Sequence, residues 1–152
     1  MKSKWNLLLA SFIVLTLAIF LSALVVYAQG NPADAAKPSI VLVHGAFADG
    51  SGWSHVIPLL EKEGYTVTAV QNPLTSFEAD VETTKRMVAA QNGLVVLVGH
   101  SYGGAVITAA SVGATNIKAL VYVAAFGPDS GEALGPLLEK YPSLIGAALV
   151  PD

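Results

Sequence analysis

The sequence contains no cysteine, and this absence excludes several chemistries at once. Without cysteine there is no disulfide framework, no thiolate nucleophile and no cysteine-based zinc or iron–sulfur site. Histidine is scarce too: the three present are scattered and form no H-x-x-x-H pair that could ligate zinc. Phosphate-binding and dinucleotide-binding glycine patterns are incomplete as well. We therefore predict no metal and no cofactor.

Basic residues are not in excess, and charge of either sign is sparse. The chain of 152 residues carries 8 Lys and Arg against 11 Asp and Glu, a net charge of −3, and only 12% of its residues are charged. Such a chain lacks the basic footprint of a nucleic-acid-binding protein. A hydrophobic content of 53% is incompatible with disorder, and the length allows one modest domain.

The first 28 residues differ in character from the rest of the chain. Lys2 and Lys4 are the only charged residues there, and no charge interrupts the segment from Trp5 to Ala28. This pattern predicts a cleaved export signal, although the apolar run is long enough for an uncleaved signal anchor, which would be the only membrane contact. In both cases we expect an exported protein: periplasmic, secreted or anchored on the outer side. Residues 29–38, rich in small residues and proline, are predicted to be a linker.

From residue 39 onward, short apolar runs alternate with segments of helical periodicity. We predict strands at Ser39–Val43, Tyr65–Val70, Leu94–Val98 and Ile117–Ala124, and helices at Trp53–Glu63, Phe77–Gln91 and Gly104–Val112. Strands that are apolar on both faces and alternate with helices form a parallel sheet covered on both sides. The predicted fold class is therefore α/β, with an open, mostly parallel sheet, because four such units cannot close a barrel.

The third predicted strand is followed by the sequence GHSYGG, residues 99–104. A G-x-S-x-G pattern between a strand and a helix is typical of a nucleophile elbow, in which a strained turn exposes the serine hydroxyl. Gly99 and Gly103 would remove Cβ atoms that clash where strand and helix meet. Ser101 is therefore the predicted nucleophile, and the backbone N–H of Tyr102 is predicted to bind an oxyanion at the positive end of the helix.

A second glycine-rich loop, HGAFADGSGW at residues 44–53, follows the first predicted strand. The carboxyl ends of parallel strands form one edge of a sheet, so this loop is predicted to bring a second backbone N–H to the same oxyanion. His44 is expected to hold the loop in place by a hydrogen bond. Phe47 and Trp53 either line a pocket or pack against the core, and the sequence leaves both alternatives open.

Together, these two loops and the order of elements over residues 39–126 resemble the N-terminal half of an α/β-hydrolase. They are similar in particular to small esterases related to plant methyl-ester hydrolases and hydroxynitrile lyases, and to their bacterial relatives. The resemblance implies an acyl-enzyme on Ser101, an oxyanion hole formed by the N–H groups of Ala46 and Tyr102, and a small ester or acyl substrate. It also implies that residues 39–152 form an incomplete hydrolase domain whose lid begins near residue 127, with Phe126 lining the pocket. The supporting residues of the elbow and loop would be His44, Gly45, Gly99, His100, Gly103 and Gly104.

The catalytic acid and histidine of such a hydrolase follow the serine in the chain, yet the last histidine here is His100. His100 is expected to pack at the elbow and point away from Ser101, and His55 to lie on the surface of a helix. Asp129 is expected to be a loop or capping residue rather than the triad acid. The sequence therefore predicts a serine hydrolase whose acid and histidine are missing from this chain. A non-catalytic fragment or a degenerate envelope protein of the same fold is the alternative.

Truncation would also affect the sheet. The strand predicted at Ile117–Ala124 would lack its expected neighbours and present an apolar edge that favours aggregation. The oligomeric state is left open.

Overall fold

The computed structural model describes residues 16, 37–129 and 131–142 of the chain. The chain divides into two compact units, residues 1–36 and 37–152, and every element below belongs to the second. The predicted export segment and most of the predicted linker lie outside the described residues. Among the residues that are described, no helix is long and apolar enough to cross a membrane.

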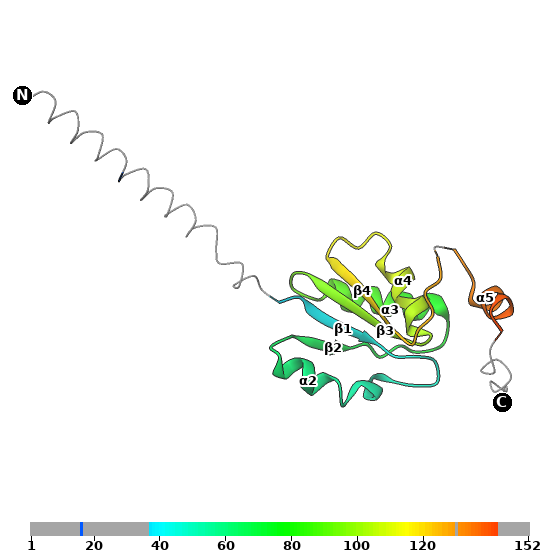
Figure 1. Ribbon diagram of the computed structural model, residues 1–152, viewed down its shortest axis with the longest axis horizontal. Helices are drawn as coiled ribbons and strands as arrows, with labels where there is room; N and C mark the ends of the chain where they lie inside the picture. The colour runs from blue at the N-terminus through cyan, green and yellow to red at the C-terminus, as the bar shows by residue number, and fades with distance from the viewer. Residues whose placement is uncertain (1–15, 17–36, 130, 143–152) are drawn as a thin grey trace, which may run out of the picture. The chain divides into compact units, whose positions relative to one another are not determined.

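The sheet contains four parallel strands: β1 (Ser39–Val43), β2 (Val67–Ala69), β3 (Val95–His100) and β4 (Ile117–Val123). Their order in space is β2-β1-β3-β4, so β1 and β3 are the central pair (Figure 1). Val43 at the end of β1 lies opposite Gly99 near the end of β3. This register brings the two glycine-rich loops that follow these strands to the same edge of the sheet.

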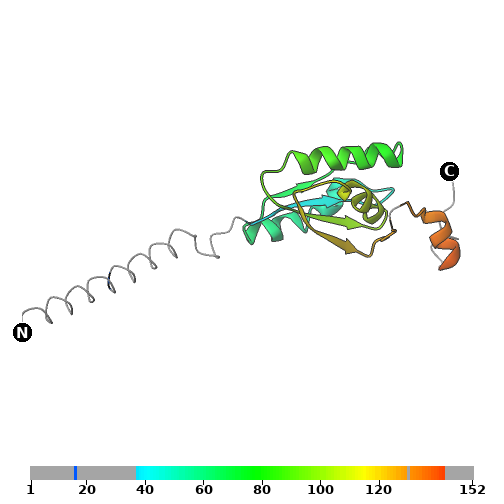
Figure 2. The ribbon, with the colours of Figure 1, turned by 90° about the horizontal axis from the view of Figure 1, so that it is seen from above.

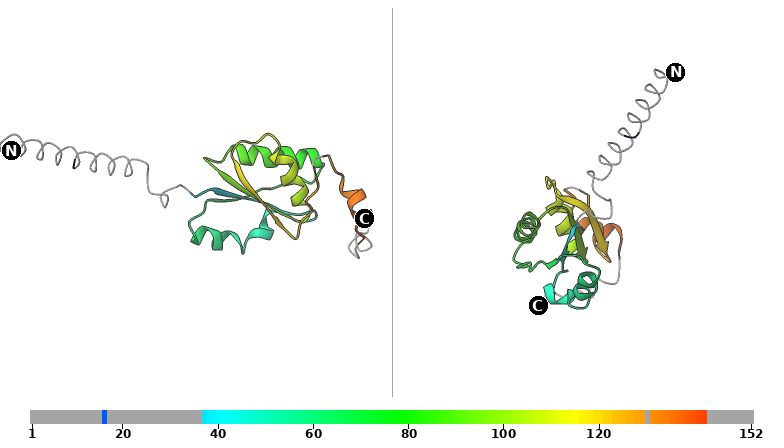
Figure 3. Two further views of the ribbon diagram at one scale, coloured as in Figure 1. Left: turned by 45° about the horizontal axis from the view of Figure 1, so that its top comes forward. Right: turned by 90° about the vertical axis from the view of Figure 1, so that its left-hand side faces the viewer.

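Helices cover both faces of the sheet. The 3-10 helix η2 (Gly50–Trp53) and α2 (Ile57–Lys62) pack on one face, and α3 (Phe77–Ala89) and α4 (Gly103–Ser111) pack on the other (Figures 2 and 3). The predicted fold class, an open parallel sheet between helices, is confirmed. A further helix, α5 (Leu134–Lys140), follows β4 where the lid was predicted to begin.

The core consists of two apolar layers, one on each face of the sheet. Val41 and Val43 of β1 belong to the cluster under α3 and α4, whereas Ile40 and Leu42 belong to the cluster under η2 and α2. All four side chains are buried. Successive residues of a strand point to opposite faces, so the continuous apolar run of β1 fills both layers.

Several element boundaries differ from those predicted from the sequence. The helix predicted to begin at Trp53 begins at Ile57, because Pro58 lies in its first turn, where a missing N–H is tolerated. The segment before it forms η2 instead. β2 is shorter than predicted, and β3 continues through His100, so the first two residues of the GHSYGG motif belong to the strand. The start of α3 agrees with prediction, and the Ser76 side chain caps it by accepting the Ala79 N–H at 3.1 Å.

Candidate active site

Ser101 occupies the turn between β3 and α4 with a backbone φ of +53°, a left-handed conformation that non-glycine residues rarely adopt. Hydrogen bonds hold it there: its carbonyl oxygen accepts the N–H of Gly104 at 3.0 Å and that of Phe126 at 3.1 Å. Its own N–H donates to the Val123 carbonyl at 3.4 Å. The end of β4 and the start of α4 thus hold Ser101 in a strained conformation. Such a conformation persists only where the surrounding structure enforces it.

The glycines of the motif allow this close packing of backbone on backbone. A Cβ atom at Gly99 would lie 2.6 Å from the carbonyl oxygen of Gly103. A Cβ atom at Gly103 would lie 2.6 Å from the carbonyl oxygen of Val43, and one at Gly104 would overlap the backbone of Phe126. No larger residue fits at these three positions without displacing main chain.

The loop after β1 passes directly beside the serine. A Cβ atom at Gly45 would be 3.0 Å from the Ser101 Cβ, and the next residue, Ala46, lines a cavity of about 300 Å³ together with Tyr102. Among the described residues, no hydrogen bond uses the backbone N–H of Ala46 or of Tyr102. Two residues with unpaired backbone N–H groups therefore line one cavity beside the half-buried Ser101 turn. An oxyanion hole is built from backbone N–H donors of this kind.

His44 anchors this loop from beneath. Its ring is buried, its Nε2 accepts the Asn72 N–H at 3.1 Å, and its Nδ1 lies 2.8 Å from the Gly45 carbonyl oxygen. Because Nε2 accepts, the proton is assigned to Nδ1, which donates to Gly45. Both nitrogens are thus used to position the loop, and neither is free to take a proton from Ser101.

The other two histidines are not placed as bases either. The His100 ring is exposed and meets Trp53 edge-on with 6.4 Å between the ring centroids, and His55 is exposed before α2. No histidine of the described chain is hydrogen-bonded to Ser101. Asp129 is exposed, and its backbone N–H donates to Glu132 Oε2 at 2.9 Å, which closes a local turn.

Three aromatic residues were candidates for lining a pocket, with core packing as the alternative for Phe47 and Trp53, and one of the three borders the cavity beside the serine. Phe47 is 87% exposed, with φ +60°, and lines it. Trp53 is instead buried in the core beneath the sheet, because η2 turns it inward. Phe126 is half-buried and does not line this cavity, although its N–H holds the Ser101 carbonyl. The remaining lining residues are Leu74, Thr75, Ser76, Phe77 and Asp80.

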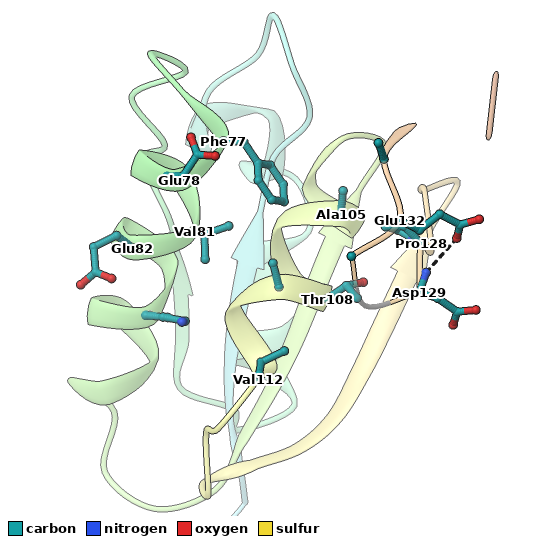
Figure 4. A pocket seen from close by; sticks show the side chains of 14 residues that line it. Phe77, Glu78, Val81, Glu82, Ala105, Thr108, Val112, Pro128, Asp129 and Glu132 are labelled. Carbon is teal, nitrogen blue, oxygen red and sulfur yellow. Dashed lines mark hydrogen bonds between the residues drawn. The ribbon is translucent and has the colours of Figure 1, made fainter. Parts of the chain in front are cut away.

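A larger cavity of about 710 Å³ lies between α3, α4 and residues 128, 129 and 131–133 (Figure 4). Its floor is apolar, with Val81, Ala105 and Val112, and the carboxylates of Glu82 and Glu132 lie at its rim. Ser101, Ala46 and Tyr102 do not line it. Ala46 and Tyr102 line the smaller cavity instead; Ser101, which precedes Tyr102, adjoins that cavity without lining it.

Asp80 is a buried residue of the site for which the sequence offered no functional signal. Its Oδ2 accepts the Tyr102 hydroxyl at 2.8 Å, and its Oδ1 accepts the Leu74 N–H at 2.9 Å. Burial, and then the hydrogen bond to Asp80, raise the pKa of Tyr102 above its usual range, so the phenol remains protonated and donates. An aspartate in the first turn of a helix is ordinarily explained by the helix dipole, which hides this second role.

Comparisons with known proteins agree with this architecture. Residues 40–151 match the Alpha/beta hydrolase family. The chain is 35% identical over 124 residues to an alpha-hydroxynitrile lyase of Arabidopsis thaliana, covering 72% of this chain and 48% of that protein. It is 37% identical over 115 residues to a carbendazim hydrolyzing esterase of Nocardioides sp., covering 67% of this chain and 48% of that protein.

Solved structures show the same relationship. An extracellular alpha/beta-hydrolase from a Paenibacillus species superposes with a TM-score of 0.56 at 26% identity, covering 74% of this chain and 52% of that one. The chain spans about half the length of the curated relatives it matches. With its parallel sheet and its serine elbow, the chain belongs to the alpha/beta hydrolase family.

Proposed function

We propose that Ser101 is the nucleophile of an exported serine hydrolase that cleaves small carboxylic esters. One observation carries this proposal: a strained serine lies at the strand-to-helix turn beside a cavity lined by two residues whose backbone N–H groups are unpaired. The match to a carbendazim hydrolyzing esterase and to several methylesterases supports ester chemistry. The export signal predicted for residues 1–28 supports the location.

In the proposed reaction, the Ser101 Oγ attacks the ester carbonyl carbon as its proton passes to a general base. The carbonyl oxygen becomes an oxyanion that accepts hydrogen bonds from the N–H groups of Ala46 and Tyr102. The alcohol leaves with the proton, which yields the acyl-enzyme. Water then attacks the acyl carbon, the acid is released and the Ser101 proton is restored.

The described residues do not supply the general base of this reaction. His44 holds the loop after β1, the His100 ring packs against Trp53, and His55 is exposed before α2. We propose that the acid and the histidine of the triad are not among the 152 residues of this chain. A hydrolase site without its base retains a small part of its catalysis through the oxyanion hole and binding. Ser101 should accordingly react slowly in this chain alone.

The placement of the three histidines also favours a second candidate. A protein of this fold in which no imidazole reaches the serine can be non-catalytic, either as a fragment or as a degenerate envelope protein. Such a protein would keep the strained turn at Ser101 because the strands and α4 pack around it, without using the hydroxyl in a reaction. The two candidates differ in whether the Ser101 hydroxyl reacts at all.

A fluorophosphonate probe tests the proposal because it forms a covalent adduct with a reactive serine hydroxyl, at a rate that reports how reactive the hydroxyl is. We expect slow adduct formation on Ser101, located by peptide mass spectrometry, and complete loss in Ser101→Ala. Ser111→Ala is the matched control, since the Ser111 hydroxyl is bonded to the Thr108 carbonyl at the end of α4. Adduct that persists in Ser101→Ala would refute the assignment of the nucleophile. Absence of any adduct in the wild-type chain would favour the non-catalytic candidate.

A further inference from the structure

Asp80 lies in the first turn of α3, 22 residues before Tyr102, and the residue is 1% exposed. A buried carboxylate is costly unless hydrogen bonds replace its lost hydration. Here each oxygen accepts one hydrogen bond, from the Tyr102 hydroxyl at 2.8 Å and from the Leu74 N–H at 2.9 Å. The N-terminal end of α3 adds a favourable field. Asp80 is therefore a satisfied charge with two specific partners.

These two partners come from different walls of the cavity beside Ser101. Leu74 belongs to the loop between β2 and α3 and has a backbone φ of +55°, whereas Tyr102 follows the nucleophile directly. The carboxylate thus connects the loop to the elbow. A single side chain sets the separation of two segments that border the proposed oxyanion site.

The Tyr102 ring is restrained from two directions. Its hydroxyl is held by Asp80, and the ring meets the edge of Phe77 with 6.2 Å between centroids. A side chain held at its tip resists displacement of the Cα atom to which it is attached. The orientation of the Tyr102 N–H is coupled to this restraint, because a fixed ring limits how the backbone at Tyr102 can move.

We propose that Asp80 is a positioning residue for the oxyanion hole, acting through the Tyr102 hydroxyl to hold the Tyr102 N–H toward the developing charge. This inference rests on the proposed function of Ser101. Electrostatic stabilisation by a preorganised donor depends on that donor being aimed before the reaction begins. Asp80 itself forms no bond with the reacting atoms.

Four variants separate positioning from folding. Tyr102→Phe removes only the hydroxyl and keeps the N–H. Asp80→Asn removes the charge but retains an amide oxygen for the Leu74 N–H. The double variant combines both changes. Glu82→Gln is the matched control, since it removes one carboxylate from the same helix at an exposed ion pair with Arg86.

The experiment measures the fluorophosphonate reaction of Ser101 in the full chain at a temperature where every variant remains folded by circular dichroism. Rates over a range of probe concentrations yield a limiting rate and a half-saturation concentration. We expect Asp80→Asn and Tyr102→Phe each to lower the limiting rate about tenfold, short of the roughly 10²- to 10³-fold lost when an oxyanion donor is removed. The half-saturation concentration should stay unchanged, and the double variant should be no slower than the slower single variant. Glu82→Gln should react as the wild type does.

Unchanged limiting rates in the two single variants would overturn the inference while leaving Ser101 as the nucleophile. Losses that multiply in the double variant would overturn it as well, because Asp80 would then act independently of the Tyr102 hydroxyl. An effect confined to the half-saturation concentration would make Asp80 a lining residue only. A wild-type chain that does not react at Ser101 would refute the proposed function, and with it this inference.

Discussion

At the scale of single residues, the backbone geometry of Ser101, the proposed nucleophile, depends on neighbouring glycines that lack a Cβ atom. Ser101 holds a left-handed backbone conformation because main chain from β1, β3 and the segment after β4 crowds around it. Gly99, Gly103 and Gly104 permit this crowding. Close packing around these glycines holds Ser101 in its strained conformation. Their substitution should therefore lower the stability of the fold in addition to any effect on the reactivity of Ser101.

Gly103→Ala should lower the free energy of unfolding by about 3 kcal/mol or more, a cost typical of severe overpacking. Its Cβ would lie 2.6 Å from the carbonyl oxygen of Val43 and 2.7 Å from that of His44, and neither buried backbone group can move freely. Gly52→Ala is the control, because nothing lies within 4 Å of the added atom. Urea unfolding of both variants measures the difference. Equal stabilities would show that the elbow tolerates a Cβ by rearranging.

At the scale of elements, β4 is one of the two edge strands of the sheet, and β2 is the other. β4 pairs with β3 on one side, and among the described strands none pairs with its other side. Val121, Tyr122 and Val123 are each about two-fifths exposed, at 40%, 41% and 41%. An apolar strand with unpaired backbone groups is a template for adding strands of other molecules. The exposed apolar edge predicted from the sequence is therefore present.

Val121→Lys should slow the aggregation of the 152-residue chain several-fold, since a charge on an edge strand opposes strand addition. Val112→Lys serves as the control: Val112 is 63% exposed and apolar, but it lies at the end of α4 rather than on a strand. Light scattering at a fixed protein concentration follows both variants. An equal benefit from the two substitutions would attribute aggregation to apolar exposure in general and not to the edge of β4.

At the scale of the whole molecule, the described residues include the proposed nucleophile and the proposed oxyanion site but no histidine hydrogen-bonded to Ser101. β1, β3 and the loops that follow them build the first two functions within one unit of residues 37–152. His44 anchors the loop after β1, the His100 ring contacts Trp53, and His55 is exposed. The proposed reaction therefore lacks only a group that accepts the Ser101 proton, and a small basic molecule added to the solution can take that part.

Added imidazole should accelerate the reaction of Ser101 with a fluorophosphonate in the isolated chain. Only unprotonated imidazole can accept the Ser101 proton. Because the pKa of an unperturbed histidine imidazole is about 6.5, the acceleration should increase as the pH rises from about 6 to about 8. A morpholine buffer at equal concentration controls for ionic strength, and Ser101→Ala controls for reaction elsewhere. A rate that does not respond to imidazole would show that the missing base is not what limits Ser101.

The sequence by itself determined the features that depend on neighbouring residues. Apolar runs and helical periodicity predicted the four strands and the parallel α/β fold, because burial on both faces leaves a local pattern. The glycines around Ser101 predicted the elbow, because a sharp strand-to-helix turn needs small residues in fixed positions. Boundaries were predicted less well: Pro58 delays the start of α2, and β3 runs on through His100.

Only the tertiary structure decided which distant residues meet. The bond from Tyr102 to Asp80 joins residues 22 positions apart, and the bond from Asn72 to His44 spans 28. Neither pair has a local pattern, because each contact depends on the order of the strands and on how α3 packs beside α4. The local sequence likewise does not determine which of Phe47 and Trp53 is buried. Both are aromatic residues of one loop, yet the turn of η2 buries Trp53 and leaves Phe47 exposed beside the serine.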